Sequence, residues 1–195
     1  MTPREVEEYR ALRATIRERG SVRIYLFVAV LAAWAAATIA TTTLVTLPVA
    51  TLLPLLLLAG GFEAIFQLHT GVERIGRYLQ VFYGDVDDSV PVREWERTAM
   101  DYGRSFPGGS DSLFTLFFFF ATVINFVPVM LAVPEPQPIE LVVAGGVHAL
   151  FAGRLVIARR YSGRQRALDL ERFHQMRRAI GAGGPVGREG QQNGP

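Results

Sequence analysis

Apolar residues gather in long blocks along this chain, and the charged residues lie between the blocks. Four blocks reach the ~20 residues that a helix needs to cross ~30 Å of hydrocarbon; they are residues 24–47, 49–68, 113–133 and 139–158. An open strand would leave its backbone groups unsatisfied in lipid, so each block is expected to be a helix. The pattern predicts an all-α membrane protein with four transmembrane helices.

The distribution of arginine predicts the orientation. Six Arg residues precede the first span, five lie between the second and third, and nine lie in or after the end of the fourth. The connections 46–48 and 134–138 contain none. Because basic residues favour cytoplasmic loops, both termini are expected in the cytoplasm. The short outer connections make two antiparallel hairpins, 24–68 and 113–158. All 20 basic residues are Arg, which we interpret as the codon bias of a GC-rich bacterium and hence as a bacterial inner (cytoplasmic) membrane.

The cytoplasmic segments have their own helical patterns. Amphipathic helices are predicted at residues 1–20, within the connection 69–112, and at 159–180, whereas the Gly-rich tail 181–195 is expected to be disordered. Thr2 and Glu5 form a capping-box pattern with Pro3 at the first helical position. For residues 1–20, a helix lying on anionic lipid headgroups through its arginines is favoured over one that docks on a partner protein.

Composition excludes several classes of site. The chain lacks Cys, which rules out disulfides and thiolate-ligated metals. Its net charge is only +2 and its arginines follow the membrane topology, so no nucleic-acid partner is expected. The three His residues fall at different depths, the acidic turn 85–88 lacks calcium-loop spacing, and no nucleophile motif is present. We therefore predict no metal, no cofactor and no catalytic residue.

Polar residues inside the spans are the first functional candidates, because they are costly to place in lipid. They are Glu63, Asn125, His148 and Arg154. Counting ~1.5 Å per residue puts Asn125 and His148 at the same depth near the midplane, so a hydrogen bond between them is expected. Glu63 and Arg154 lie at a similar depth near the cytoplasmic side. An ion pair between them and a neutral Glu63 are both consistent with the sequence.

Helix packing and the membrane boundary supply the other candidates. Gly145, Ala149 and Gly153 recur every four residues, a spacing that permits close approach of helices. At the cytoplasmic boundary, the run 62–83 links a span to an amphipathic helix. The juxtamembrane candidates on the cytoplasmic side are His69, Arg74, Arg77 and Trp95.

The function favoured by these features is that of a structural, assembly or regulatory membrane component. Its partners would be the bilayer, anionic headgroups, and a cytoplasmic protein or further copies of the chain. A subunit of an oligomeric small-solute transporter or channel is the alternative, indicated by the Pro and Gly residues within the spans. A membrane enzyme has the least support, because the intramembrane polar residues are too sparse for evident chemistry.

Overall fold

The computed structural model describes residues 1–44, 47–84, 111–131 and 137–182. Four long α-helices account for most of them: α1 (Pro3–Leu44), α2 (Leu52–Tyr83), α4 (Asp111–Leu131) and α5 (Pro138–Gly181). A single turn of 3-10 helix, η1 (Pro48–Thr51), leads into α2. The described residues contain no strand, as the all-α prediction requires.

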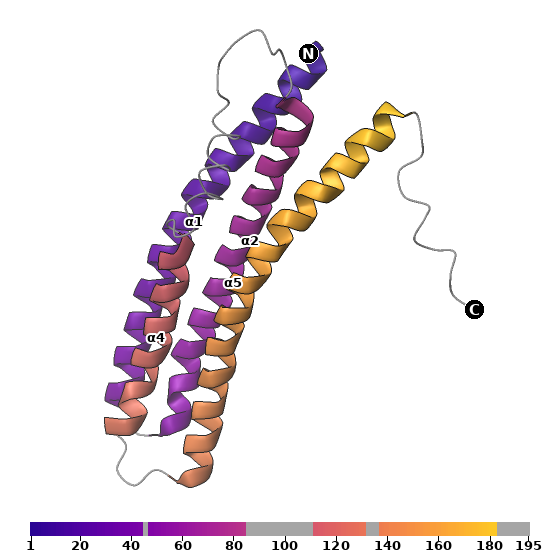
Figure 1. Cartoon of the computed structure of the whole chain (residues 1–195). Helices are drawn as coiled ribbons and strands as arrows, with labels where there is room; N and C mark the ends of the chain where they lie inside the picture. The colour runs from indigo at the N-terminus through magenta and orange to yellow at the C-terminus, as the bar shows by residue number, and fades with distance from the viewer. Residues whose placement is uncertain (45–46, 85–110, 132–136, 183–195) are drawn as a thin grey trace, which may run out of the picture.

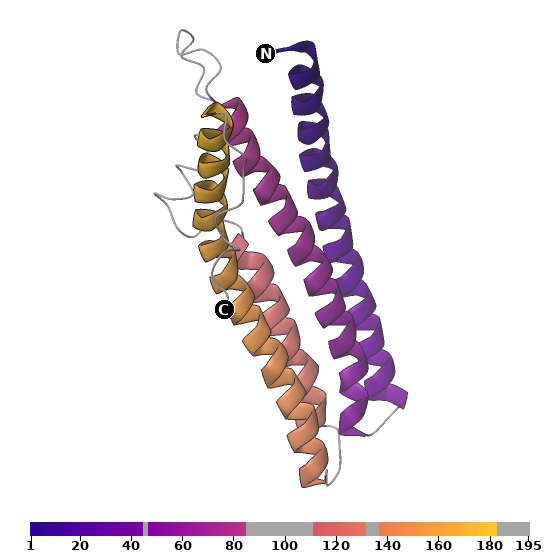
Figure 2. The ribbon, with the colours of Figure 1, turned by 90° about the vertical axis from the view of Figure 1, so that its right-hand side faces the viewer.

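Helix α2 lies at the centre of the bundle. It packs against α1 on one side and against α4 and α5 on the other; α1 and α4 run antiparallel to α2, whereas α5 runs parallel to it (Figures 1 and 2). The core is built from apolar side chains of α2, α4 and α5: Leu55, Leu58, Phe62, Ile65, Phe118, Ala121, Phe151, Leu155 and Ala158. Among the described helices, α4 begins near the middle of the bundle, so one end holds all four of them and the other holds α1, α2 and α5 (Figure 1).

Large apolar side chains also face outwards at the four-helix end. Exposed examples come from every helix there, such as Leu56 of α2, Phe120 of α4 and Leu150 of α5, which is 75% exposed. An apolar surface of this extent is unfavourable in water and favourable in lipid. Helix α1, the stretch Pro48–Tyr83 and α5 are each long and apolar enough to cross a membrane, while the described part of α4 has a shorter apolar stretch, Phe114–Val127. The chain is thus a helical membrane protein.

Two predicted helix boundaries are absent. A break was expected between residues 1–20 and the span that starts at 24, and another between the span that ends at 158 and residues 159–180. The structure instead makes each pair one helix, 42 residues long in α1 and 44 in α5. Ser and Gly lie near both expected breaks, but neither residue type removes a backbone hydrogen bond as Pro does, so the helix continues through them. The first segment is therefore an extension of α1.

Local capping signals explain where the helices begin. The predicted capping box is present: Thr2 N–H donates to Glu5 (2.6 Å), and Glu5 N–H donates to the Thr2 hydroxyl (3.3 Å). A second capping box, between Gln137 and Glu140 at the start of α5, was not predicted. Pro54 lies in the first turn of α2, where its missing N–H has no partner to lose. It therefore starts that helix without kinking it.

Close helix packing occurs at a glycine that was not predicted. A Cβ added to Gly61 would lie 2.3 Å from Cγ1 of Val30, so α1 and α2 meet there as only Gly allows. The predicted row behaves differently. Gly145 contacts the ring of Phe126, but Ala149 and Gly153 are exposed, and a Cβ on Gly153 would meet nothing within 4 Å. This row is not a continuous packing face within one copy, because α5 turns that side outwards.

Two predicted elements lie outside the described residues. These are the short helix around Trp95 in the central connection and the tail from residue 183 onwards. Helix α2 itself continues beyond the predicted span to Tyr83, where the amphipathic pattern had indicated a helix leaving the membrane.

Candidate functional site

One buried polar centre lies among the apolar helices, and we call it the Asn125 cluster: Trp34, Thr38, Thr51, Asn125 and His148. The Asn125 side chain of α4 is fully buried and His148 of α5 is 5% exposed. Asn125 Nδ2 lies 2.9 Å from His148 Nε2, so the predicted hydrogen bond is present. Nδ2 also donates to the carbonyl oxygen of Thr51 (2.9 Å). From α1, the Trp34 indole and the Thr38 hydroxyl donate to Oδ1, at 3.1 and 3.3 Å.

The geometry of the Asn125 cluster fixes the imidazole tautomer. His148 Nδ1 lies 2.7 Å from the carbonyl oxygen of Ala144, and a carbonyl oxygen only accepts, so Nδ1 carries the proton. Nε2 then accepts from the amide of Asn125. An amide side chain offers two N–H donors and two lone pairs. Both donors are used here, the Trp34 indole donates to the oxygen, and the single Thr38 proton is shared between that oxygen and the carbonyl oxygen of Trp34, 2.8 Å away. The cluster ties α1, η1, α4 and α5 together with its amide fully satisfied.

A second intramembrane pair joins α2 to α5. Arg154 Nε lies 2.8 Å from Glu63 Oε1, and Arg154 Nη2 donates to Glu63 Oε2 at 2.9 Å. This fork-to-fork geometry is the strongest form of an Arg–carboxylate contact. The guanidinium also stacks over the rings of Phe62 and Phe66, at 5.9 and 5.4 Å from their centroids. Of the two alternatives left open by the sequence, the structure has the ion pair.

The largest charged centre lies beyond the apolar blocks, between α2 and α5, and we call it the Arg77 cluster. Arg77 is only 2% exposed. Its Nη1 lies 3.2 Å from Glu73, one turn earlier on α2, and its Nη2 donates to Asp169 of α5 at 3.1 Å. Arg166 of α5 pairs with the same Glu73, and Arg74 lies 3.5 Å from Asp169. A buried guanidinium thus sits between two carboxylates that are each shared with a second arginine.

Histidine and a small cavity adjoin the Arg77 cluster. Arg23 Nη1 lies 2.8 Å from His69 Nδ1; because the guanidinium only donates, Nδ1 accepts and the Nε2 side faces Glu73 at 3.7 Å. A cavity of about 330 Å³ is lined by residues that include Arg19 and Gln165, as well as members of the cluster. Nε of Arg77 has no hydrogen-bond partner among the described residues, and the cavity is large enough to hold water beside it.

The acidity of Glu73 reflects its surroundings. Burial alone would raise the pKa of this carboxyl group, but electrostatic attraction to the His69 ring, the hydrogen bond and charge of Arg166, and the charge of Arg77 outweigh burial, so its pKa is lowered from the ordinary 4.5. The carboxylate is therefore ionised through the physiological range. Its negative charge and that of Asp169 are what allow Arg77 to remain buried.

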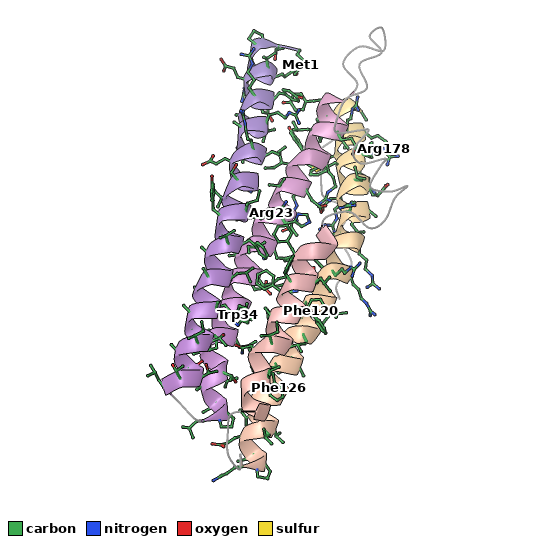
Figure 3. All side chains as sticks on the ribbon, turned by 90° about the vertical axis from the view of Figure 1, so that its left-hand side faces the viewer. Met1, Arg23, Trp34, Phe120, Phe126 and Arg178 are labelled. Carbon is green, nitrogen blue, oxygen red and sulfur yellow. The ribbon has the colours of Figure 1, made fainter. Side chains whose placement is uncertain are left out.

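Aromatic and capping contacts hold the far tips of the three extended helices together. The Tyr78 hydroxyl donates to Glu8 of α1 at 3.0 Å, and its ring centroid lies 5.8 Å from that of Phe173 on α5. Burial, followed by the neighbouring Glu8, raises the pKa of Tyr78 to about 12. Arg177 donates to the carbonyl oxygen of Val81 (2.7 Å) and so caps the last turn of α2. In Figure 3, Met1 and Arg178 lie at this tip, while Phe126 lies towards the opposite end.

The structure brings together most of the predicted candidates. Asn125 meets His148, Glu63 meets Arg154, and three juxtamembrane candidates enter the Arg77 cluster: His69, Arg74 and Arg77. Trp95 lies outside the described residues.

Other members of these centres were not singled out as site residues. They are Trp34, Thr38, Thr51, Glu73, Arg166 and Asp169. The signal for Asp169 in the sequence is that it lies, with Gln165, on the otherwise apolar stripe of α5.

No group of three or more His, Asp or Glu side chains that could hold a metal ion occurs in the part of the chain that the structure describes. Comparison with known proteins found no matching family model, no similar curated protein and no similar solved structure.

Proposed function

We propose that this chain is a membrane-embedded scaffold or regulatory subunit that acts through a protein partner on the cytoplasmic side. It crosses the bacterial inner membrane four times as two hairpins, with both termini in the cytoplasm. The arginine distribution supports this orientation: the ends of α1, α2 and α5 that project beyond α4 are the arginine-rich ends.

The observation that carries the proposal is the Arg77 cluster. It locks the projecting parts of α2 and α5 together with buried charge, while Tyr78 and Glu8 attach α1. A small apolar group is also buried there, formed by Leu79, Val81, Tyr83 and Leu170, and the ion pairs fix how the projecting helices align around it. A preorganised surface binds a partner with a smaller loss of conformational entropy than flexible tails do.

An exposed apolar face on the projecting part of α5 supports a protein partner. Leu168 is 49% exposed, Met176 39% and Ile180 61%. Exposed large apolar side chains on an otherwise arginine-rich helix favour contact with another protein over contact with water. The Asn125 cluster, by contrast, has satisfied its amide internally, which suits holding helices together better than binding a passing solute.

Single-cysteine labelling tests the orientation cleanly, because the chain has no Cys of its own. We expect Gln137→Cys, at the start of α5, to react with a membrane-impermeant maleimide on intact cells. Glu171→Cys should react only in inverted vesicles. Labelling of the second variant on intact cells would contradict the proposed orientation.

Site-specific photo-crosslinking in the native membrane tests the partner. A crosslinkable amino acid at Leu168 and at Ile180 should yield the same adduct at both positions, and one at Val142, near the other end of α5, should not. The adduct should disappear in Asp169→Asn, which weakens the Arg77 cluster but leaves the crosslinking positions Leu168 and Ile180 themselves unchanged. Absence of any adduct from both positions would refute a partner bound to this face.

A transporter or channel subunit is the second candidate, and the observation behind it is that the Asn125 cluster places polar groups within the apolar bundle. Reconstitution into liposomes decides between the two. A selective solute flux that Asn125→Leu abolishes would favour transport, whereas the scaffold proposal expects no flux.

A further inference from the structure

A groove between the start of α4 and the middle of α5 belongs to neither polar cluster. Its volume is about 910 Å³, within the range of ~300–1,000 Å³ typical of small-molecule sites. One part is apolar, formed by Leu116 and Phe119 of α4 and by Leu155 and Val156 of α5. The other part is cationic.

Three arginines line the cationic part: Arg159, Arg160 and Arg164. All three are exposed. Arg160 and Arg164 make no ion pair with any residue that the structure describes, and they are four positions apart, so they project from neighbouring turns of one helix face. None of the described residues that line the groove is Asp or Glu. The described lining therefore carries three positive charges and no negative charge.

The order of these parts along the helices matches the membrane boundary. Leu116, Phe119 and Val156 belong to the outward-facing apolar surface, at 47%, 39% and 46% exposure. The arginines follow directly at the point where α5 leaves the apolar block. A ligand that fills both parts has an anionic end at the headgroup level and an apolar end beside the helices.

We propose that this groove binds one anionic phospholipid of the cytoplasmic leaflet, with its phosphate at Arg159, Arg160 and Arg164 and an acyl chain along Phe119 and Val156. Arginine suits the contact because its planar fork matches phosphate oxygens, and basic pockets between transmembrane helices are known to recognise such headgroups. A soluble protein could not reach the apolar half, which faces lipid. The inference depends on the proposed orientation of α5, which the cysteine labelling tests separately.

Native mass spectrometry of the purified full chain in detergent tests the proposal, with phosphatidylglycerol, cardiolipin and phosphatidylcholine added in turn. We expect one anionic lipid to be retained and phosphatidylcholine to be lost. Each arginine near a charged surface contributes about fivefold in affinity, so Arg159→Gln, Arg160→Gln and Arg164→Gln together should weaken anionic-lipid binding about 100-fold.

Two further variants separate the groove from general surface charge and from misfolding. Arg4→Gln, Arg10→Gln and Arg17→Gln together remove the same charge from exposed positions of α1 and should leave lipid retention unchanged. Replacing the three groove arginines by Lys keeps the charge and should retain most of the binding.

Three results would overturn the proposal. Equal retention of phosphatidylcholine would remove the headgroup preference. Equal loss of lipid in the α1 variant would show that net charge alone is responsible. Displacement of the lipid by inorganic phosphate alone would make the groove a site for free anions. None of these results bears on the protein partner, because the purified chain is measured without one.

Discussion

Asp169→Asn is the most informative single change in this protein, because it removes one of two carboxylates from a buried arginine. Arg77 is 2% exposed and would retain only Glu73, which Arg166 already shares. Removing a partner from a buried ion pair costs about 3–5 kcal/mol when the remaining charge is left uncompensated. Since Glu73 remains and the new amide oxygen still accepts, we expect a smaller loss of about 2–3 kcal/mol in the stability of the projecting helices.

Hydrogen exchange of backbone amides in the projecting part of α5 measures this loss directly. Where exchange follows local opening, a loss of about 2–3 kcal/mol accelerates it roughly 30- to 150-fold. Glu171→Gln, two positions further along α5, is the matched control. Its pair with Arg178 is 3.5 Å long and both side chains are largely exposed, so the change should be below about 0.5 kcal/mol.

A double substitution tests whether the lost stability comes from the uncompensated charge of Arg77. Replacing the pair by apolar side chains, as Arg77→Met with Asp169→Leu, removes both buried charges and should recover much of the lost protection. If Asp169→Asn exchanges no faster than Glu171→Gln, Arg77 is not held by Asp169 in the membrane-bound protein, and the Arg77 cluster does not lock the projecting helices together.

Three further predictions concern packing, the intramembrane cluster and acid. Gly61→Ala should destabilise the α1–α2 contact by about 1–3 kcal/mol in detergent unfolding, because its Cβ would clash with Val30; Gly60→Ala, with nothing within 4 Å, should not. Asn125→Leu removes the centre of a buried hydrogen-bond network and should cost about 2 kcal/mol, measured by the same unfolding; an unchanged midpoint would contradict it. Because the folded-state pKa of Glu73 is lowered from 4.5, the stabilisation it provides is complete above pH 4.5 and is lost as the pH falls through the lower folded value. Far-UV circular dichroism should show a loss of helical signal over this acid range, and the loss should be smaller in Glu73→Gln.

Depth counting along the helices was enough to pair residues inside the membrane. Asn125 and His148 flank a short connection at equal distances, so their meeting follows from the rise of an α-helix alone. Glu63 and Arg154 lie on different hairpins, and the sequence could only establish that their depths are similar.

Contacts between distant helices could not be predicted in this way. Arg77 and Asp169 are 92 positions apart, and their meeting depends on the rotation of α5 about its own axis, which no local pattern determines. Trp34 and Asn125 are 91 apart and present the same difficulty. Likewise, Gly61 is one of two adjacent glycines in the sequence, and only the position of α1 decides which of them meets Val30.

The continuity of the long helices has a mechanical consequence. Helix α5, with 44 residues, is ~66 Å long, about twice the thickness of the hydrocarbon core. The helix bends near its middle (Figure 1) but continues through the bend without a break, so its two halves remain mechanically coupled. A change of about 10° in tilt, of the kind that a thicker or thinner bilayer imposes, would move the projecting tip by about 5 Å. In the proposed arrangement, α5 therefore acts as a lever that converts the thickness of the surrounding bilayer into a displacement in the cytoplasm.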